Sequence, residues 1–412
     1  MNIGKIILSI LFIFLYDENV VIRYDGLLKG GDIMKRIGLL PRIIIAILLG
    51  ILIGAFMPNW FIRIFTTFNE VFGNFLGFAI PLIIIAFIAP GIGEIGKGAG
   101  KFLGFTAGLA YLSTIFAGIL AYIATSSLFP VLLGNTVKSG AYDNPGETSL
   151  APFFELQIPA VMGVMSALVL AFTLGLGMAA IKGNSLKNIM IDFRSIIELV
   201  ISKVIIPLLP LHILGIFANM TQGGQVQTIM TVFGKVFVLI IALHLTMLVI
   251  QYTVSGAISR KNPFAMLKGM LPAYFTALGT QSSASTIPVT LERAKRIGVR
   301  EKVADFSVPL LATIHLSGST ITLVSCAMAV MYMNGLELSF GLILQFILML
   351  GVTMIAAPGV PGGAVMAALG LLDTMLGFDG TMLALMMALY LAQDSFGTAC
   401  NVTGDGALAK AV

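Results

Sequence analysis

Residues 279–286 read Gly-Thr-Gln-Ser-Ser-Ala-Ser-Thr and interrupt an apolar segment with small, polar side chains. Three basic residues precede this stretch within 260–268, and five follow it within 293–302. Lys and Arg are retained on the cytoplasmic side of membrane proteins, so a single crossing would leave one of these clusters on the wrong side. We therefore expect the segment 264–291 to enter a membrane and return to the same, inner face.

A second segment, 338–372, predicts the mirror image of this hairpin. Its roughly 35 residues would reach about 50 Å as one helix, whereas the hydrocarbon core of a bilayer is about 30 Å thick. Residues 356–363 read Ala-Ala-Pro-Gly-Val-Pro-Gly-Gly, and such a run breaks a helix. The flanks, Glu337 and Asp373, are acidic, which favours entry from outside. Broken segments that dip from opposite faces indicate a transporter binding site.

The composition excludes a soluble protein. The mean hydropathy is +1.01, with 58% hydrophobic and 10% charged residues, whereas soluble domains carry about 25% charged residues. Apolar runs of about 20 residues recur, which is typical of spanning helices and not of a membrane barrel. The net charge of +5 lies in short loops and forms no nucleic-acid-binding stripe. Cys326 and Cys400 lie in apolar segments, so no disulfide framework is expected.

The alternation of basic loops predicts an all-α polytopic membrane protein with eight transmembrane helices, two re-entrant helical hairpins and an inside amino terminus. Full spans are expected at 39–58, 73–92, 101–128, 159–181, 195–217, 228–256, 304–332 and 376–410. We divide the chain into the first six helices, 34–258, and a core, 259–412. Residues 1–33 are interpreted as an N-terminal extension or a misassigned start, with a signal peptide or an extra anchor as the alternative.

The last expected span carries an acidic stripe. Asp394, Thr398, Asn401 and Asp405 are spaced four, three and four residues apart, so they share one helical face. Carboxylates inside a membrane are costly and mark functional sites. The alternative is hydrogen bonding between helices, which seldom needs two acids without a basic partner.

The seventh span contains a second polar cluster, residues 313–320, which read Thr-Ile-His-Leu-Ser-Gly-Ser-Thr. A glycine flanked by hydroxyl groups favours an unwound stretch whose carbonyl groups suit hard cations. His315 lies inside this cluster, and we leave open whether it is functional or packed. His212 and His244 are expected to be packed structural residues.

Four motifs now occur in a characteristic order: 282–290, 315–319, 359–363 and 394–405. Together they resemble the dicarboxylate/amino acid:cation symporter family, which includes the glutamate transporters. The resemblance covers most of 34–412. It implies a homotrimer with elevator-type alternating access, in which the hairpin tips act as gates. It also implies that helices 1, 2, 4 and 5 form a scaffold, whereas helices 3 and 6 move with the transport core.

The resemblance assigns the site residue by residue. Asp394 should hold the substrate ammonium group, and the backbone of both hairpin tips should receive its carboxylate. The expected substrate-binding residues are Gln281, Ser282, Ser283, Ser319, Val360, Pro361, Gly362, Asp394, Gly397, Thr398 and Asn401. The expected cation ligands are Thr313, His315, Asn401 and Asp405.

Two departures from the family pattern restrict which substrate and which coupling ion we expect. Acidic-substrate members place an arginine at the position of Gly397, and some place one at Gln281. An unpaired second carboxylate in a dry site would cost several kcal/mol, so a small or polar neutral amino acid is favoured. Ser317 and His315 replace the usual acid and amide of a third sodium site, and we interpret Ser113 and Thr114 as remnants of its outer ligands.

We therefore expect a multi-pass transporter of the cell membrane, not an enzyme, that couples uptake of a small neutral amino acid to sodium. Lipid and further copies of the chain are the expected partners, and no cofactor is implied. The alternative is a sodium- or proton-coupled symporter of a dicarboxylate or acidic amino acid, with His315 titrating near neutral pH. A channel is disfavoured because the two tips differ in composition, and an enzyme because no nucleophile, metal or phosphate motif stands out.

Overall fold

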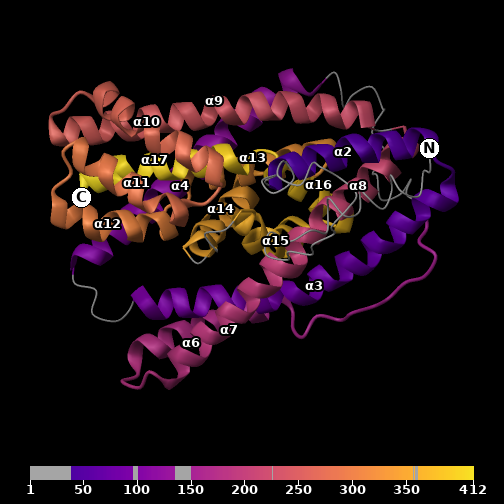
Figure 1. The fold of residues 1–412 in the computed structure, drawn as a ribbon, viewed down its shortest axis with the longest axis horizontal. Coiled ribbons are helices and arrows are strands. Elements are labelled where there is room, and N and C mark those ends of the chain that lie inside the picture. Colours follow the sequence, from indigo (N-terminus) through magenta and orange to yellow (C-terminus); the bar gives the residue numbers. More distant parts are fainter. Residues whose placement is uncertain (1–38, 96–100, 135–149, 225, 356, 358–360) are drawn as a thin grey trace, which may run out of the picture.

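The computed structural model describes residues 39–95, 101–134, 150–224, 226–355, 357 and 361–412, and every regular element in these ranges is a helix. The expected extension 1–33 lies outside the described residues. Figure 1 shows the arrangement. The first half contains α2 (Leu39–Phe56), α3 (Asn59–Ile95), α4 (Lys101–Leu132), α6 (Val164–Ala180), α7 (Ser185–Val200), the π-helical turn η2 (Ile201–Ile205), α8 (Ile206–Gln222) and α9 (Val226–Ser259). The second half contains α10 (Pro263–Thr280), α11 (Ser283–Arg296), α12 (Glu301–Ile314), α13 (Ser317–Met333), α14 (Phe340–Met354), α15 (Gly363–Leu376), α16 (Gly380–Leu391) and α17 (Asp394–Ala411).

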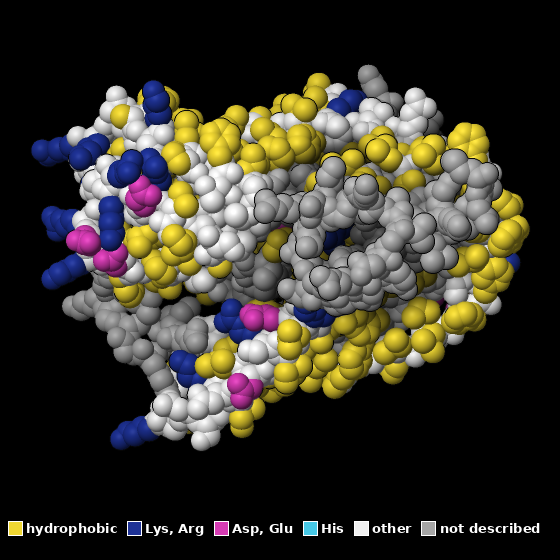
Figure 2. Space-filling view, viewed as in Figure 1, with side chains coloured by type: hydrophobic (Ala, Val, Ile, Leu, Met, Phe, Trp, Pro, Cys, Tyr) yellow, Lys and Arg dark blue, Asp and Glu magenta, His cyan; other side chains and the backbone are white. Residues whose placement is uncertain are grey.

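Five helical runs in the described ranges are long and apolar enough to cross a membrane: Asn59–Gly93, Gly104–Leu132, Ser185–Gln222, Val226–Ser259 and Glu301–Met333. Large apolar side chains lie exposed along these helices, including Leu112 on α4 and Val238 on α9. The space-filling view shows the same apolar belt, with Lys and Arg gathered mainly at one end of the molecule (Figure 2). Such a surface is stable only in lipid. The chain is therefore a multi-pass membrane protein.

The polar tip in 279–286 is reduced to two non-helical residues. Gln281 adopts the left-handed conformation, with φ of 54°, and ends α10. Ser282 is the N-cap of α11, and its side chain accepts a hydrogen bond from the Ser285 N–H. Because serine is a strong N-cap, α11 begins at once and the chain reverses within one turn. Helices α10 and α11 pack against each other and against α17.

The seventh span is interrupted where the polar cluster predicted it. Helix α12 ends at Ile314 and α13 begins at Ser317, with His315 and Leu316 in extended or irregular conformations. In the second broken segment, α14 ends at Met354 and α15 begins at Gly363.

The observed last span differs from the expected range of 376–410. It begins at Gly380, after Gly377 takes a φ of 70° and Asp379 caps α16, and it is interrupted at Ala392 and Gln393. The interruption places Asp394 in the first turn of α17. A carboxylate is favoured there by the unpaired N–H groups and positive dipole of a helix N-terminus.

The fourth span is shorter than the expected 159–181, because α6 begins only at Val164. Before it, the chain from 150 to 163 contains no helix and runs beside α3 (Figure 1). Arg63 on α3 fixes this segment by donating to the carbonyl oxygens of Ala151 and Pro152 and by covering the Phe153 ring.

Two sets of helices pack mainly among themselves. Helices α2, α3, α6, α7 and α8 form one set, and α3 and α6 run along one side of the molecule (Figure 1). Helices α4, α9, α10, α11, α12, α13 and α17 form the other, with α17 in its centre. Helices α15 and α16 contact both sets.

Candidate substrate and cation site

The second hairpin is joined to the last span by one buried carboxylate. Asp394 is buried in the first turn of α17, and its Oδ2 accepts a hydrogen bond of 2.7 Å from the Gly362 N–H. Gly362 has a φ of 75°, and a Cβ there would lie 2.8 Å from Leu391 Cδ2. Glycine is therefore required both by the backbone conformation and by the close approach of the tip.

The start of α13 is capped from a neighbouring helix. Its own N-cap, Leu316, offers no side-chain acceptor. Instead the Asn401 Oδ1 on α17 accepts from the Gly318 N–H at 2.7 Å and the Ser319 N–H at 3.2 Å, while Asn401 Nδ2 donates to Ser319 Oγ at 2.9 Å. Free N–H groups at a helix start need acceptors. Asn401 thus locks the two broken spans together.

The same two helices touch through glycines. A Cβ on Gly318 would lie 2.4 Å from the Gly397 carbonyl oxygen and 2.6 Å from Cys400 Cβ, so no larger residue fits. A Cβ on Gly397 would meet nothing closer than 3.4 Å, at Thr322 Oγ1. Gly397, which stands where acidic-substrate relatives carry arginine, therefore lies against the backbone of Ser319.

A second buried polar cluster surrounds His315. The His315 Nδ1 and Asp405 Oδ1 lie 2.8 Å apart, and both side chains are fully buried. On the other side of the ring, His315 Nε2 lies 3.1 Å from Ser113 Oγ on α4. Gln251 on α9 donates to Ser113 Oγ and Ser317 Oγ. Four helices thus meet at one hydrogen-bonded network.

This network contains two oxygens that suit a hard cation. Asp405 Oδ2 and Gln251 Oε1 are buried and accept no hydrogen bond from the described residues. Hard cations such as sodium prefer carboxylate and amide oxygens. The donor set therefore fits a sodium ion next to the His315 ring.

Gln251 and His244 are participants that the sequence did not single out as functional. The His244 Nε2 lies 3.0 Å from the Gly318 carbonyl oxygen and 3.1 Å from Thr322 Oγ1, behind the interrupted stretch. One polar residue in an apolar span is the only signal for either, and it also fits simple packing.

Other predicted site residues are less closely joined. Thr313 is exposed, and its hydroxyl donates to the Leu310 carbonyl oxygen in its own helix. At the first tip, the Thr286 hydroxyl donates to the Ser282 carbonyl oxygen. Thr398 is buried on the same helix as Asp394. Four further residues remain. Gln281 and Pro361 are half-buried, Ser283 is buried, and Val360 lies outside the described residues.

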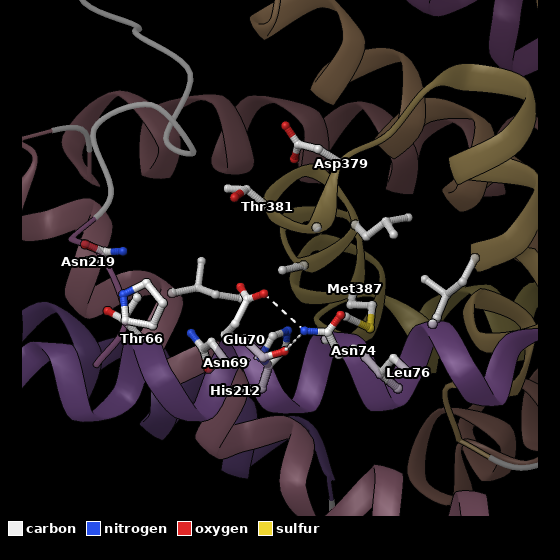
Figure 3. A pocket seen from close by; sticks show the side chains of 18 of the residues that line it. Thr66, Asn69, Glu70, Asn74, Leu76, His212, Asn219, Asp379, Thr381 and Met387 are labelled. Carbon is white, nitrogen blue, oxygen red and sulfur yellow. Dashed lines mark hydrogen bonds between the residues drawn. The ribbon is translucent and has the colours of Figure 1, made fainter. Parts of the chain in front are cut away.

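A cavity lies elsewhere, between α3 and α8 on one wall and α15 and α16 on the other (Figure 3). Its volume is about 840 Å³, and Glu70, Asp373 and Asp379 line it without any lining Lys or Arg. Glu70 Oε1 accepts from Asn74 Nδ2 at 3.0 Å. None of the residues predicted to bind substrate or cation lines this cavity; Gly362, Asp394 and Asn401 lie instead at the buried contacts of α13, α15 and α17.

Apolar spanning helices whose polar groups gather at interruptions define a membrane transporter. Comparison with known proteins agrees. Residues 39–412 match the sodium:dicarboxylate symporter family, and the chain belongs to that family. It is similar to the serine/threonine transporter SstT of Acinetobacter baumannii (strain AYE), with 26% identity over 392 residues that cover 92% of this chain and 98% of that protein. SstT of Streptococcus suis (strain 05ZYH33) is 27% identical over 345 residues, 81% of this chain and 94% of that one.

Proposed function

We propose that this protein is a sodium-coupled symporter of a small neutral amino acid, with serine and threonine as the first substrates to test. The observation that carries the proposal is the buried Asp394 carboxylate, held by the Gly362 N–H at the meeting point of two broken segments. No arginine occurs between 261 and 292 or after Arg300. Such a site offers an anion for a substrate ammonium group and no cation for a second carboxylate.

The roles follow from this arrangement. Asp394 binds the ammonium group, and the backbone N–H groups of the two tips, 281–283 and 360–362, receive the α-carboxylate. Ser319, Thr398 and Asn401 contact the rest of the substrate, with Gly397 leaving space beside them. The relatives described as serine/threonine transporters support a substrate of this size and polarity.

Sodium binds beside the substrate in this proposal. Asp405 and Asn401 on α17 provide oxygen ligands, and Thr313 belongs to a further site with carbonyl oxygens of the second hairpin. The His315–Asp405 contact and the unpaired oxygens of Asp405 and Gln251 support a cation site at this depth. The family to which the chain belongs supports sodium as the coupling ion.

Transport proceeds by elevator-type alternating access. The proposed scaffold comprises α2, α3, α6, α7 and α8, whereas α4, α9 and residues 259–412, with both re-entrant hairpins, form the moving core. The separate packing of the two sets supports this division. A homotrimer is proposed because the non-helical segment 150–163 exposes Phe153, Phe154 and Leu156 beside α3. Non-helical backbone at membrane depth must be covered by protein.

Uptake into proteoliposomes tests the proposal. Serine, threonine and alanine should accumulate only with an inward sodium gradient, and glutamate should not compete. Asp394→Asn should abolish uptake, because it removes the charge that binds the ammonium group while keeping the shape. Glu337→Gln, which changes an exposed acid outside both the site and the cavity, is the matched control and should transport normally.

The same vesicles test the alternative, symport of an acidic substrate or coupling to protons. Efficient uptake of glutamate or a dicarboxylate would show that the substrate is acidic and would contradict the proposed neutral amino acid. Accumulation driven by a pH gradient without sodium would replace the proposed ion. Equal uptake of every amino acid without any gradient would contradict coupled symport altogether.

A further inference from the structure

Three positive charges converge where α9, α11 and α17 end. Lys410, in the last turn of α17, donates to the Gly298 carbonyl oxygen at 2.5 Å. A Cβ on Gly298 would lie 2.8 Å from Lys261 Nζ and 3.7 Å from Lys410 Nζ, so the two ammonium groups flank this glycine. Lys261 and Arg300 are the like charges that repel Lys410. Holding three cations together costs free energy unless an anion joins them.

Two neighbouring cations, Lys295 and Arg296, differ because they already have acidic partners. Lys295 contacts Asp305 at 2.7 Å and Glu301 at 3.3 Å, and the hydrogen bond with Asp305 raises the pKa of Lys295. Arg296 contacts Glu292 at 2.7 Å. Within the described ranges, no carboxylate pairs with any of the three convergent cations. The basic end of the molecule (Figure 2, left) therefore contains cations that are paired with carboxylates and, among the described residues, these three that are not.

An exposed apolar stripe begins directly beside these cations. Phe264, Leu271 and Phe275 on α10 are all exposed, and their spacing of seven and four places them on one helical face. Phe264 follows Lys261 by three residues. The basic loops place this end on the cytoplasmic side. A cation cluster at the membrane boundary, continued by an apolar stripe, matches a phosphate group with acyl chains attached.

We propose that Lys261, Arg300 and Lys410 bind the phosphate of an anionic lipid of the inner leaflet, with its acyl chains along α10. The lipid joins the α9–α10 turn, the α11–α12 turn and the end of α17. It therefore holds together the inner ends of the helices around the first hairpin. Lipid binding at this site does not rest on the identity of the transported substrate.

The test is a thermal-shift titration of purified protein with phosphatidylglycerol or phosphatidylcholine, since a ligand of the folded state raises Tm. Phosphatidylglycerol should raise Tm, and phosphatidylcholine should raise it much less. The double substitution Lys261→Gln with Arg300→Gln leaves the Lys410–Gly298 hydrogen bond in place. It should weaken phosphatidylglycerol binding by roughly 25-fold, at about fivefold for each cation removed.

Lys295→Gln with Arg296→Gln is the matched control, because it changes the net charge equally but removes two cations that already have acidic partners. It should retain the phosphatidylglycerol response. An equal loss of the phosphatidylglycerol response in both double variants would contradict a specific lipid site. It would indicate general attraction between the basic surface and anionic lipid. An equal Tm rise with inorganic phosphate at the same concentration would overturn the lipid in favour of a free-phosphate site.

Discussion

Gly318 is the residue at which the two broken spans are closest. The N–H of Gly318 and the N–H of Ser319 both donate to Asn401 Oδ1, and a Cβ at Gly318 would overlap the Gly397 carbonyl oxygen. Neither neighbour can retreat without breaking a helix. The glycine therefore sets the distance between α13 and α17, on which every other contact of the site depends.

Gly318→Ala should destabilise the protein by about 1–3 kcal/mol, the range for overpacking a buried contact. Gly397→Ala is the matched control, because its Cβ would meet only ordinary contacts from 3.4 Å outward. The measurement is thermal unfolding of the purified protein, where Gly318→Ala should lower Tm by several degrees more than Gly397→Ala. Equal Tm values would show that the helices separate easily and that the contact does not fix their distance.

At the scale of single residues, the sequence singled out residues whose placement inside a membrane costs free energy. It did not single out the residues that form hydrogen bonds around them. Asp394 and Asp405 stand out because a carboxylate in an apolar helix requires a reason. Gln251 and His244 do not, because one amide or imidazole in a span fits ordinary packing equally well. Their roles depend on Ser113, Ser317 and Gly318, which come from other helices, so no local pattern could assign them.

At the scale of helical elements, the His315–Asp405 contact joins α13 to α17, and Ser113 and Gln251 extend the contact to α4 and α9. A buried carboxylate that loses its partner is left with uncompensated charge. The contact therefore stabilises the packing of four helices as well as the position of one ion ligand.

His315→Leu should destabilise the protein by about 3 kcal/mol in sodium-free buffer, because it leaves the buried Asp405 carboxylate without its hydrogen-bond partner. Adding Asp405→Asn to His315→Leu should recover part of the loss, because the stranded charge is removed. His212→Leu is the control, since the hydrogen-bond partner of the His212 ring is the neutral Asn69 amide and not a carboxylate. Thermal unfolding of the unmodified chain, His315→Leu, Asp405→Asn, the double variant and the control measures the coupling. Strictly additive losses would contradict a tie between the α12–α13 interruption and α17.

The sequence predicted the interruptions that have local causes and missed one that has a distant cause. A helix is weakened by local composition wherever it contains a run such as Gly-Thr-Gln-Ser-Ser or Pro-Gly-Val-Pro-Gly-Gly. The break at Ala392 and Gln393 contains neither proline nor glycine. It is favoured by the placement of Asp394 at a helix N-terminus, where its carboxylate accepts from Gly362, 32 residues away. The late start of α6 likewise depends on contacts between 150–153 and α3.

At the scale of the whole molecule, the cavity lies between α3 and α8 of the first set and the helices α15 and α16 (Figure 3). One wall contains Glu70 on α3, and the other contains Asp373 on α15 and Asp379 at the start of α16. Polar, acidic walls pack less tightly than the apolar contacts between α2 and α8, where Gly50 and Gly54 bring backbones together. In the proposed elevator mechanism, this polar boundary is where one set of helices slides against the other.

Chemical labelling of single cysteines tests the arrangement of the whole chain, because both hairpins must return to the face they entered. Lys268→Cys and Arg296→Cys lie on either side of the first hairpin, and Glu337→Cys and Asp373→Cys on either side of the second. All four of these side chains are exposed at the protein surface. Cys326 and Cys400 are fully buried, so the unmodified chain should give little background.

With a membrane-impermeant maleimide, Glu337→Cys and Asp373→Cys should label in intact cells, whereas Lys268→Cys and Arg296→Cys should label only after permeabilisation. The basic residues around the first hairpin require this side, and the acidic flanks of the second require the other. Labelling of Lys268→Cys and Arg296→Cys from opposite sides would mean that the first segment crosses fully. In that case Gln281–Ser283 could not meet the second tip at a common depth, and the proposed substrate site would be wrong.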